Sequence, residues 1–250
     1  MSPRHFDTPG GYSFGGQMTP AVRTLLITNV AVWLFQLLAG TLAQVRLDRL
    51  FGLVPFDVTH HLFLWQLVTY MFLHGGLFHI GFNMLALWMF GNELESLWGT
   101  PRFLRYYFVT GIGAALCTTV VSWNSYVATI GASGAIYGIL AAYGLLFPDR
   151  EILLYFILPI KAKYFVLILG IIAFWSSLSA TGDGVAHVAH LGGMLFGWLY
   201  LSGFSGGGRL GYGLRSWYSR WRHERIRKRF KVYYRKTRGD DDTGDDDTEE

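Results

Sequence analysis

The stretch GASGAIYGILAAYGLLF, from Gly131 to Phe147, decides how this chain is built. Its last fifteen residues, 133–147, carry no charge and would form a helix of about 22 Å, because each helical residue advances the chain by about 1.5 Å. The hydrocarbon core of a bilayer is roughly 30 Å thick. We therefore expect a short membrane helix that begins below the outer surface, where non-helical backbone persists only inside protein or beside a water-filled cavity.

The composition of the whole chain agrees with a membrane protein. Of its 250 residues, 52% are hydrophobic and only 15% are charged, whereas soluble domains carry about 25% charged residues. The single cysteine, Cys117, excludes an intramolecular disulfide and is interpreted as a small buried hydrophobic side chain. The N-terminus is unlike a cleavable signal, because it is interrupted before the first apolar run by Gly10, Gly11, Gly15, Gly16 and Pro20.

The apolar runs predict an all-α membrane protein with six spanning helices, the fourth of which starts at Ser133. A mixed loop over residues 44–65 is expected to lie in the membrane interface, and residues 152–164, which contain Pro159, are expected to form an interfacial return. The expected spans are residues 24–43, 66–90, 103–121, 133–147, 164–179 and 187–203.

The basic residues predict the orientation of these spans. If the N-terminus is cytoplasmic, 19 Lys and Arg residues lie inside and only Arg46 and Arg49 lie outside. Cytoplasmic loops of membrane proteins carry this excess of positive charge. Omitting the twelve basic residues after residue 208 leaves seven against two, so both termini are expected in the cytoplasm.

Three segments follow from this layout. Residues 1–20 form a flexible cytoplasmic arm and residues 21–203 form the six-span domain. Residues 204–250 contain a glycine hinge, a basic segment interleaved with aromatic residues, and an acidic tail that is expected to be disordered. Basic segments beside a membrane bind anionic lipid head groups, and the same charges also serve as a plain orientation signal.

Ser133, between small residues at the start of the fourth span, is a candidate nucleophile. Gly131 and Gly134 permit a close approach of backbone, and a helix N-terminus offers free N–H groups to a developing anion. Taken alone, the same glycine-rich run is explained as well by simple packing between helices.

His190 lies in the outer part of the sixth span, on the same side of the membrane as Ser133. Gly193 and Gly197 share its helical face, and Gly134 and Gly138 form a similar stripe on the fourth span. Such stripes allow two helices to approach closely. His190 would then accept the serine proton and return it to a leaving amine.

Two further polar residues occupy the second span. His79 and Asn83 are four residues apart and share one helical face, and both side chains donate hydrogen bonds. Donors of this kind stabilise the oxyanion of an acyl transfer, although helix packing is an alternative role. Tyr137, one turn after Ser133, is placed to pack on the imidazole of His190. Because no acid lies at membrane depth beside His190, a two-residue dyad is favoured.

Together these motifs resemble the rhomboid family of intramembrane serine proteases over roughly residues 20–203. The matching pieces are His79-x-x-x-Asn83, the run from Gly131 to Gly134 with Tyr137, Ala189-His190-x-Gly192-Gly193, and the acid-plus-glycine element of Glu95 and Gly99. The chain departs from the family pattern at Gln66, where many members carry arginine after Trp65, and at Leu97, where some carry a basic residue.

The resemblance implies a function for each matching residue. Ser133 would be the nucleophile and His190 the base, while His79, Asn83 and the backbone N–H of Ser133 would donate to the oxyanion. Gly131, Gly134 and Tyr137 would support this site. The implied substrates are transmembrane proteins, cut within or near their spanning helices, and neither a cofactor nor a nucleic acid partner is expected. The compact six-span form also implies a multi-pass protein of the bacterial inner membrane.

Two other classes of function compete with this interpretation. One is a protease-dead relative that binds membrane proteins without cutting them, although such relatives normally lose the serine or the histidine. The other is a transporter or metal-binding protein that uses the histidines of the spans and loops. The chain lacks the His-Glu-x-x-His motif, and its spans lack acidic groups. The histidines in question are His60, His61, His74, His79, His187 and His190.

Overall fold

The structure is a computed structural model that describes residues 18–154, 158–178 and 184–204. The chain divides into two compact units, Met1–Leu201 and Ser202–Glu250. Only the first three residues of the second unit are described, so the fold below is that of the first unit. The predicted cytoplasmic arm, apart from its last three residues, and nearly all of the predicted 204–250 segment lie outside the described residues.

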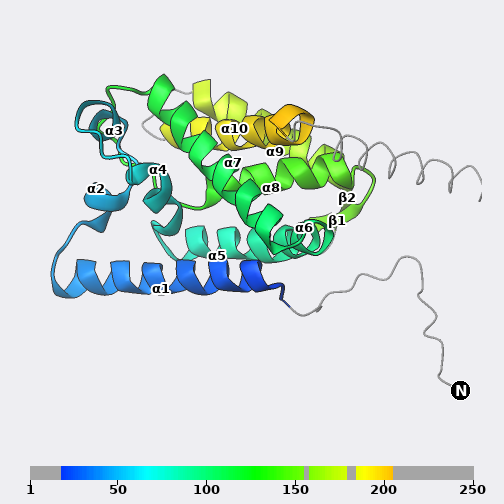
Figure 1. Cartoon of the computed structure of the whole chain (residues 1–250), viewed down its shortest axis with the longest axis horizontal. Coiled ribbons are helices and arrows are strands. Elements are labelled where there is room, and N and C mark those ends of the chain that lie inside the picture. Colours follow the sequence, from blue (N-terminus) through cyan, green and yellow to red (C-terminus); the bar gives the residue numbers. More distant parts are fainter. Residues whose placement is uncertain (1–17, 155–157, 179–183, 205–250) are drawn as a thin grey trace, which may run out of the picture. The chain divides into compact units, whose positions relative to one another are not determined.

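The described chain is mostly helical (Figure 1). Short helices and one hairpin connect the longer elements. The helices are α1 (Pro20–Leu42), α2 (Leu47–Phe51), α3 (Pro55–His60), α4 (Gln66–Thr69), the 3₁₀-helix η1 (Tyr70–Phe72), α5 (Leu77–Ala86), the π-helix η2 (Leu87–Gly91), α6 (Asn92–Trp98), α7 (Thr100–Val121), α8 (Ser133–Leu146), α9 (Ala162–Leu178), α10 (Gly184–Leu199) and the π-helix η3 (Tyr200–Phe204); the strands are β1 (Glu151–Leu154) and β2 (Leu158–Lys161).

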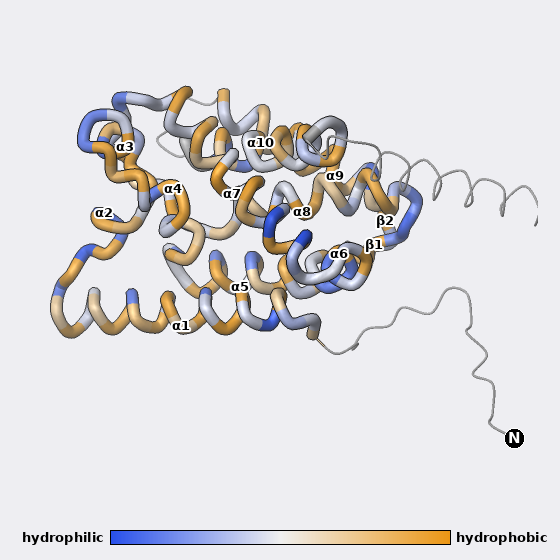
Figure 2. Tube along the Cα trace, viewed as in Figure 1, coloured by the Kyte–Doolittle hydropathy of each residue, from blue (hydrophilic) through white to orange (hydrophobic). Residues whose placement is uncertain are grey.

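Within the described residues, α1 and α7 are each long and apolar enough to cross a membrane. A third crossing is formed if the bent pair Gln66–Phe72 and Leu77–Trp98 counts as one span. The helices α8 and α9 are apolar but shorter, with 14 and 17 residues. Figure 2 shows the apolar residues that run along α1. The predicted start of the fourth helix at Ser133 agrees with the first residue of α8.

The prediction of one continuous second span over residues 66–90 is wrong. The chain bends by 98° between η1 and α5, and Leu73 at the break has extended backbone. The hydrophobic run concealed this break, although Gly75-Gly76 is a strong local signal for a turn. As a result, His79 lies in the first turn of a new helix and not in the middle of a long one.

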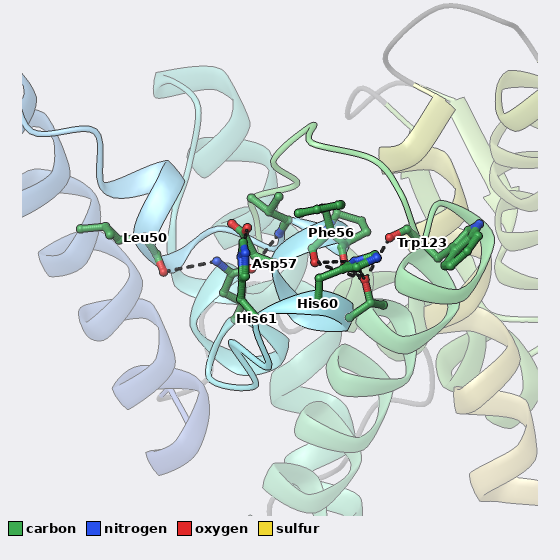
Figure 3. Close-up of polar contacts among 10 residues, drawn as sticks. Leu50, Phe56, Asp57, His60, His61 and Trp123 are labelled. Carbon is green, nitrogen blue, oxygen red and sulfur yellow. Dashed lines mark hydrogen bonds and ion pairs between the residues drawn. The ribbon is translucent and has the colours of Figure 1, made fainter.

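Two connecting segments contain secondary structure that the sequence did not predict: helices α2 and α3 in residues 44–65, and two strands in the expected return. The expected return at residues 152–164 contains an antiparallel hairpin, in which Leu153 of β1 pairs with Pro159 of β2. Proline is tolerated because each strand of a two-stranded sheet is an edge. In the expected outer loop, α3 is held by its aromatic side chains (Figure 3): Phe56 stacks on His60 with ring centroids 4.1 Å apart, and His60 lies 6.2 Å from Trp123.

The N-terminus of α1 is fixed by a carboxylate. Glu95 of α6 is 2% exposed, and its two oxygens accept hydrogen bonds from the backbone N–H groups of Ala21 and Val22, both at 2.9 Å. The Thr100 hydroxyl donates to the same carboxylate. A negative charge at the start of a helix satisfies free N–H groups and is favoured by the helix dipole. This contact ties α1 to α6 and to the start of α7.

The helix α8 lies at the centre of the fold. Eleven of its fourteen residues are buried, and it packs against α7, α9 and α10. Helix α10 in turn packs against α7, α8 and α9. The first turn of α8, which begins at Ser133, is therefore surrounded by other helices.

Candidate active site

Ser133 and His190 meet where α8 begins. The Nε2 atom of His190, in α10, lies 2.9 Å from the Oγ atom of Ser133. When the imidazole proton is on Nδ1, Nε2 accepts the hydrogen bond that the serine hydroxyl donates. Tyr137, one turn further along α8, stacks on the imidazole with ring centroids 4.1 Å apart and planes inclined by 1°. The ring of His190 is thus held by a hydrogen bond at its edge and by an aromatic ring on its face.

Glycines bring the two helices this close. A Cβ atom on Gly193 of α10 would overlap the carbonyl oxygen of Gly134 in α8. One turn along, a Cβ atom on Gly197 would lie 3.2 Å from the carbonyl oxygen of Gly138 and 2.5 Å from the Tyr106 hydroxyl. The predicted close approach of the two small-residue stripes is therefore present, and it allows His190 in the middle of α10 to reach Ser133 at the start of α8.

Gly131 connects the serine to the second pair of polar residues. Its φ of +124° is a conformation that other residues rarely adopt. A Cβ atom there would lie 2.6 Å from Nε2 of His79 and 3.7 Å from Nδ2 of Asn83. The side chains of His79 and Asn83, both from α5, therefore lie against the backbone that leads into Ser133.

Hydrogen bonds define which atoms of this pair can donate. The backbone N–H of Gly75 donates to Nδ1 of His79 at 3.3 Å. An accepting Nδ1 carries no proton, so in the neutral ring the proton is on Nε2, the atom that faces Gly131. Asn83 is 6% exposed, and its Nδ2 has no hydrogen-bond partner among the described residues. Two available donors thus lie beside the start of α8.

The remaining histidines have different surroundings. His187 packs edge-on against His190, with ring centroids 5.7 Å apart, and His74 packs edge-on against His79 at 5.1 Å. His60 lies in the aromatic contacts of α3. Nδ1 of His190 is buried and has no hydrogen-bond partner in the described parts of the chain. Asp183, the acidic residue nearest to His190 in the sequence, lies outside the described residues.

One buried residue beside the site gave no signal in the sequence. The Tyr70 hydroxyl donates to the carbonyl of Gly111 at 2.7 Å, and its backbone carbonyl accepts from the N–H of Gly131 at 2.9 Å. Tyr70 is 1% exposed. It therefore joins η1 to α7 and to the loop before Ser133. A tyrosine inside an apolar run is typical of an ordinary core residue, so the sequence did not predict this connection and only the three-dimensional contacts reveal it.

The arrangement defines a class of protein. It is a helical integral membrane protein with a half-buried serine and histidine in contact at a helix start and with two hydrogen-bond donors beside them. This is the set of groups that acyl transfer to a serine requires.

Comparison with known proteins identifies the family. A family model described as the Rhomboid domain matches residues 61–206, and the chain belongs to the rhomboid family. The putative rhomboid protease YdcA of Bacillus subtilis is 30% identical over 183 residues, which cover 73% of this chain and 87% of that protein.

Other relatives are longer than this chain. Rhomboid protein 1, mitochondrial, of Saccharomyces cerevisiae is 35% identical over 137 residues, which are 52% of this chain and 38% of the yeast protein. Rhomboid protease GlpG of Yersinia pestis is 25% identical over 183 residues, which are 73% of this chain and 62% of that protein. Several relatives are thus named as proteases, and the chain spans only part of the length of some of them.

Proposed function

We propose that this protein is an intramembrane serine endopeptidase that cuts transmembrane proteins within or near their spanning helices. The observation that carries the proposal is the 2.9 Å contact between Nε2 of His190 and Oγ of Ser133 at the first turn of α8. Proteases among the relatives make hydrolysis the expected chemistry. The residues that carry the reaction are proposed from the contacts of this chain.

In the proposed reaction, the Ser133 hydroxyl attacks the scissile carbonyl while Nε2 of His190 takes its proton. The carbonyl oxygen becomes an oxyanion, which accepts hydrogen bonds from Nε2–H of His79, from Nδ2 of Asn83 and from the backbone N–H of Ser133. His190 then gives its proton to the leaving amine, and the C–N bond breaks. Water, deprotonated by His190, attacks the resulting ester and releases the second product and the serine hydroxyl.

The proposal uses a dyad without a third acidic member. Support comes from Nδ1 of His190, which makes no hydrogen bond with a carboxylate in the described ranges. The stacked ring of Tyr137 takes over the orienting role that an acid fills in soluble serine proteases. Gly131 and Gly134 support the site by letting α5 and α10 reach the start of α8.

The membrane arrangement is part of the same proposal. We place residues 21–203 in the membrane as six spans, with both termini in the cytoplasm, and residues 204–250 as a cytoplasmic segment.

The basic residues after residue 208 are proposed to contact anionic lipid head groups. Removal of residues 209–250 should weaken binding to vesicles that contain anionic lipid, and an unchanged affinity would reject the lipid contact. The membrane is proposed to be a bacterial inner membrane.

A fluorophosphonate probe tests the function because it reacts only with an activated serine. We expect the purified protein to be labelled in detergent, and we expect Ser133→Ala and His190→Ala to lose the label. Ser177→Ala is the matched control, since Ser177 lies on α9 and its hydroxyl donates only to its own helix at Phe174. Labelling that survives in Ser133→Ala would reject the proposed nucleophile.

A catalytically dead binder and a histidine-lined transporter would each give a different result in this experiment. A dead binder is not labelled in any form, although it retains affinity for membrane proteins. A transporter or metal-binding protein responds to metal ions and to chelators, whereas labelling of Ser133 by the proposed mechanism is unchanged by chelation.

A further inference from the structure

Gln36, a polar residue on the membrane helix α1, contacts the segment that precedes His79. Its Oε1 atom accepts a hydrogen bond of 3.0 Å from the backbone N–H of His74. Val22, Asn29 and Gln36 are spaced by seven residues, so they share the face of α1 that meets the rest of the protein. A polar side chain at this depth is costly unless it has a specific partner.

The N–H group of His74 needs a partner from outside its own segment. The 3₁₀-helix η1 ends at Phe72, Leu73 is extended, and α5 starts only at Leu77. His74 is 2% exposed, so water does not reach it freely. A buried backbone N–H without a hydrogen bond costs about 1–3 kcal/mol. Gln36 therefore stabilises the 98° bend between η1 and α5 at a point where, within the described residues, the N–H of His74 donates to no backbone carbonyl.

The same short segment controls the ring of His79. His74 packs edge-on against this ring at 5.1 Å, and the neighbouring Gly75 donates its N–H to Nδ1. That hydrogen bond keeps the proton on Nε2, the atom beside Gly131. The position of residues 74–75 thus decides both the orientation of the imidazole and the nitrogen that carries the proton.

We propose that Gln36 is a positioning residue that acts through the His74–Gly75 segment to hold His79 as a donor toward the loop before Ser133. This inference rests on the proposed function for its effect on the reaction, but its effect on the ring of His79 does not depend on that function. A helix whose exposed surface is mostly apolar would in this way set the geometry of the oxyanion donors.

The first arm of the test measures His79 directly. Protein with ¹⁵N-labelled histidine is compared with Gln36→Met, which keeps the length of the side chain and removes the accepting oxygen. The His79 signals are assigned by their loss in His79→Ala. We expect the Nε2–H tautomer in the parent protein and a mixture of tautomers, or exchange broadening, in Gln36→Met. Unchanged His79 signals would overturn the proposal, whether or not the protein is a protease.

The matched control is Thr41→Val, on the same helix. The Thr41 hydroxyl donates only to the carbonyls of Leu37 and Leu38 in its own helix, so this change alters α1 without touching the bend. His79 signals and activity should stay at the parent level in Thr41→Val. Gln36→Glu retains an accepting oxygen and should restore most of the parent tautomer.

The second arm measures the rate of fluorophosphonate labelling, which needs a single reaction and no turnover. Gln36→Met should label about tenfold more slowly, a fraction of the 10²–10³-fold effect of removing an oxyanion donor outright. In the His79→Ala background the same substitution should have no further effect. An equal loss in both backgrounds would show that Gln36 acts on general stability and would overturn the positioning role. Absence of Ser133-dependent labelling in the parent protein would instead reject the proposed function.

Discussion

The carbonyl oxygen of Gly134 occupies the space that a side chain at Gly193 would need. At this close backbone contact α10 packs against α8 next to the residues that carry the proposed reaction. His190 is one turn before Gly193, and Ser133 is the residue before Gly134, so any separation of the helices at this point also separates Nε2 from Oγ.

Gly193→Ala should therefore abolish proteolysis and lower stability. The added methyl group forces the helices apart, and overpacking of this kind costs about 1–3 kcal/mol. Cleavage of a transmembrane reporter and thermal unfolding in detergent are the two measurements. Gly40→Ala is the control, because a Cβ atom at Gly40 meets nothing within 4 Å. Full activity of Gly193→Ala would show that the helix contact does not set the distance between Ser133 and His190.

Gly131→Ala should reduce activity more than stability. Alanine is strained at a φ of +124°, and its methyl group would displace Nε2 of His79 from the loop before Ser133. Gly81→Ala is the matched control, since a Cβ atom at Gly81, also on α5, meets nothing within 4 Å. We expect the rate constant kcat to fall in Gly131→Ala while Gly81→Ala stays close to the parent. Equal effects in both variants would argue against the special position of Gly131.

Asn83→Ala should leave partial activity. It removes one donor to the oxyanion, while His79 and the backbone N–H of Ser133 remain. A loss of kcat of roughly 10–100-fold is expected, below the loss seen when a dominant oxyanion donor is removed from a soluble serine protease. Because this hydrogen bond forms mainly in the transition state, KM should change little. A selective rise in KM would indicate that Asn83 binds substrate instead.

Glu95→Gln should destabilise the protein without a direct effect on the chemistry. Its carboxylate accepts from the N–H groups of Ala21 and Val22, and hydrogen bonds to charged groups contribute about 1.5–3 kcal/mol. The amide of glutamine supplies only one accepting oxygen, so one N–H of α1 loses its partner. Glu93→Gln is the comparison, because Glu93 forms a more exposed ion pair with Arg150 at 3.2 Å. A midpoint of thermal unfolding that falls equally in both variants would contradict the proposed role of Glu95.

The sequence predicted the contacts that depend on regular helical spacing. The offsets of Gly193 and Gly197 from His190 place these glycines on the same helical face as His190. The apolar run that begins at Ser133 predicts a short helix that starts there, as α8 does. Both arguments use only the 3.6-residue period and the thickness of a bilayer.

The contacts that depend on irregular backbone could not be predicted in the same way. The bend between η1 and α5 lies in an apolar run, and its effect on His79 arises from the N–H groups of His74 and Gly75. Gln36 was visible as a polar residue in the first span, but its partner is far away in the sequence. A return of the chain was predicted for residues 152–164, but the pairing of β1 with β2 was not, because a proline that is tolerated at a sheet edge does not by itself predict a strand.

The most direct test of the account is cleavage of a transmembrane reporter by purified protein in lipid, with Ser133→Ala as the only change. The parent protein is expected to cleave the reporter within or near its spanning helix, and Ser133→Ala is expected to show no detectable cleavage while its unfolding temperature matches that of the parent. Cleavage by Ser133→Ala at the parent rate would contradict the central claim that this serine is the nucleophile.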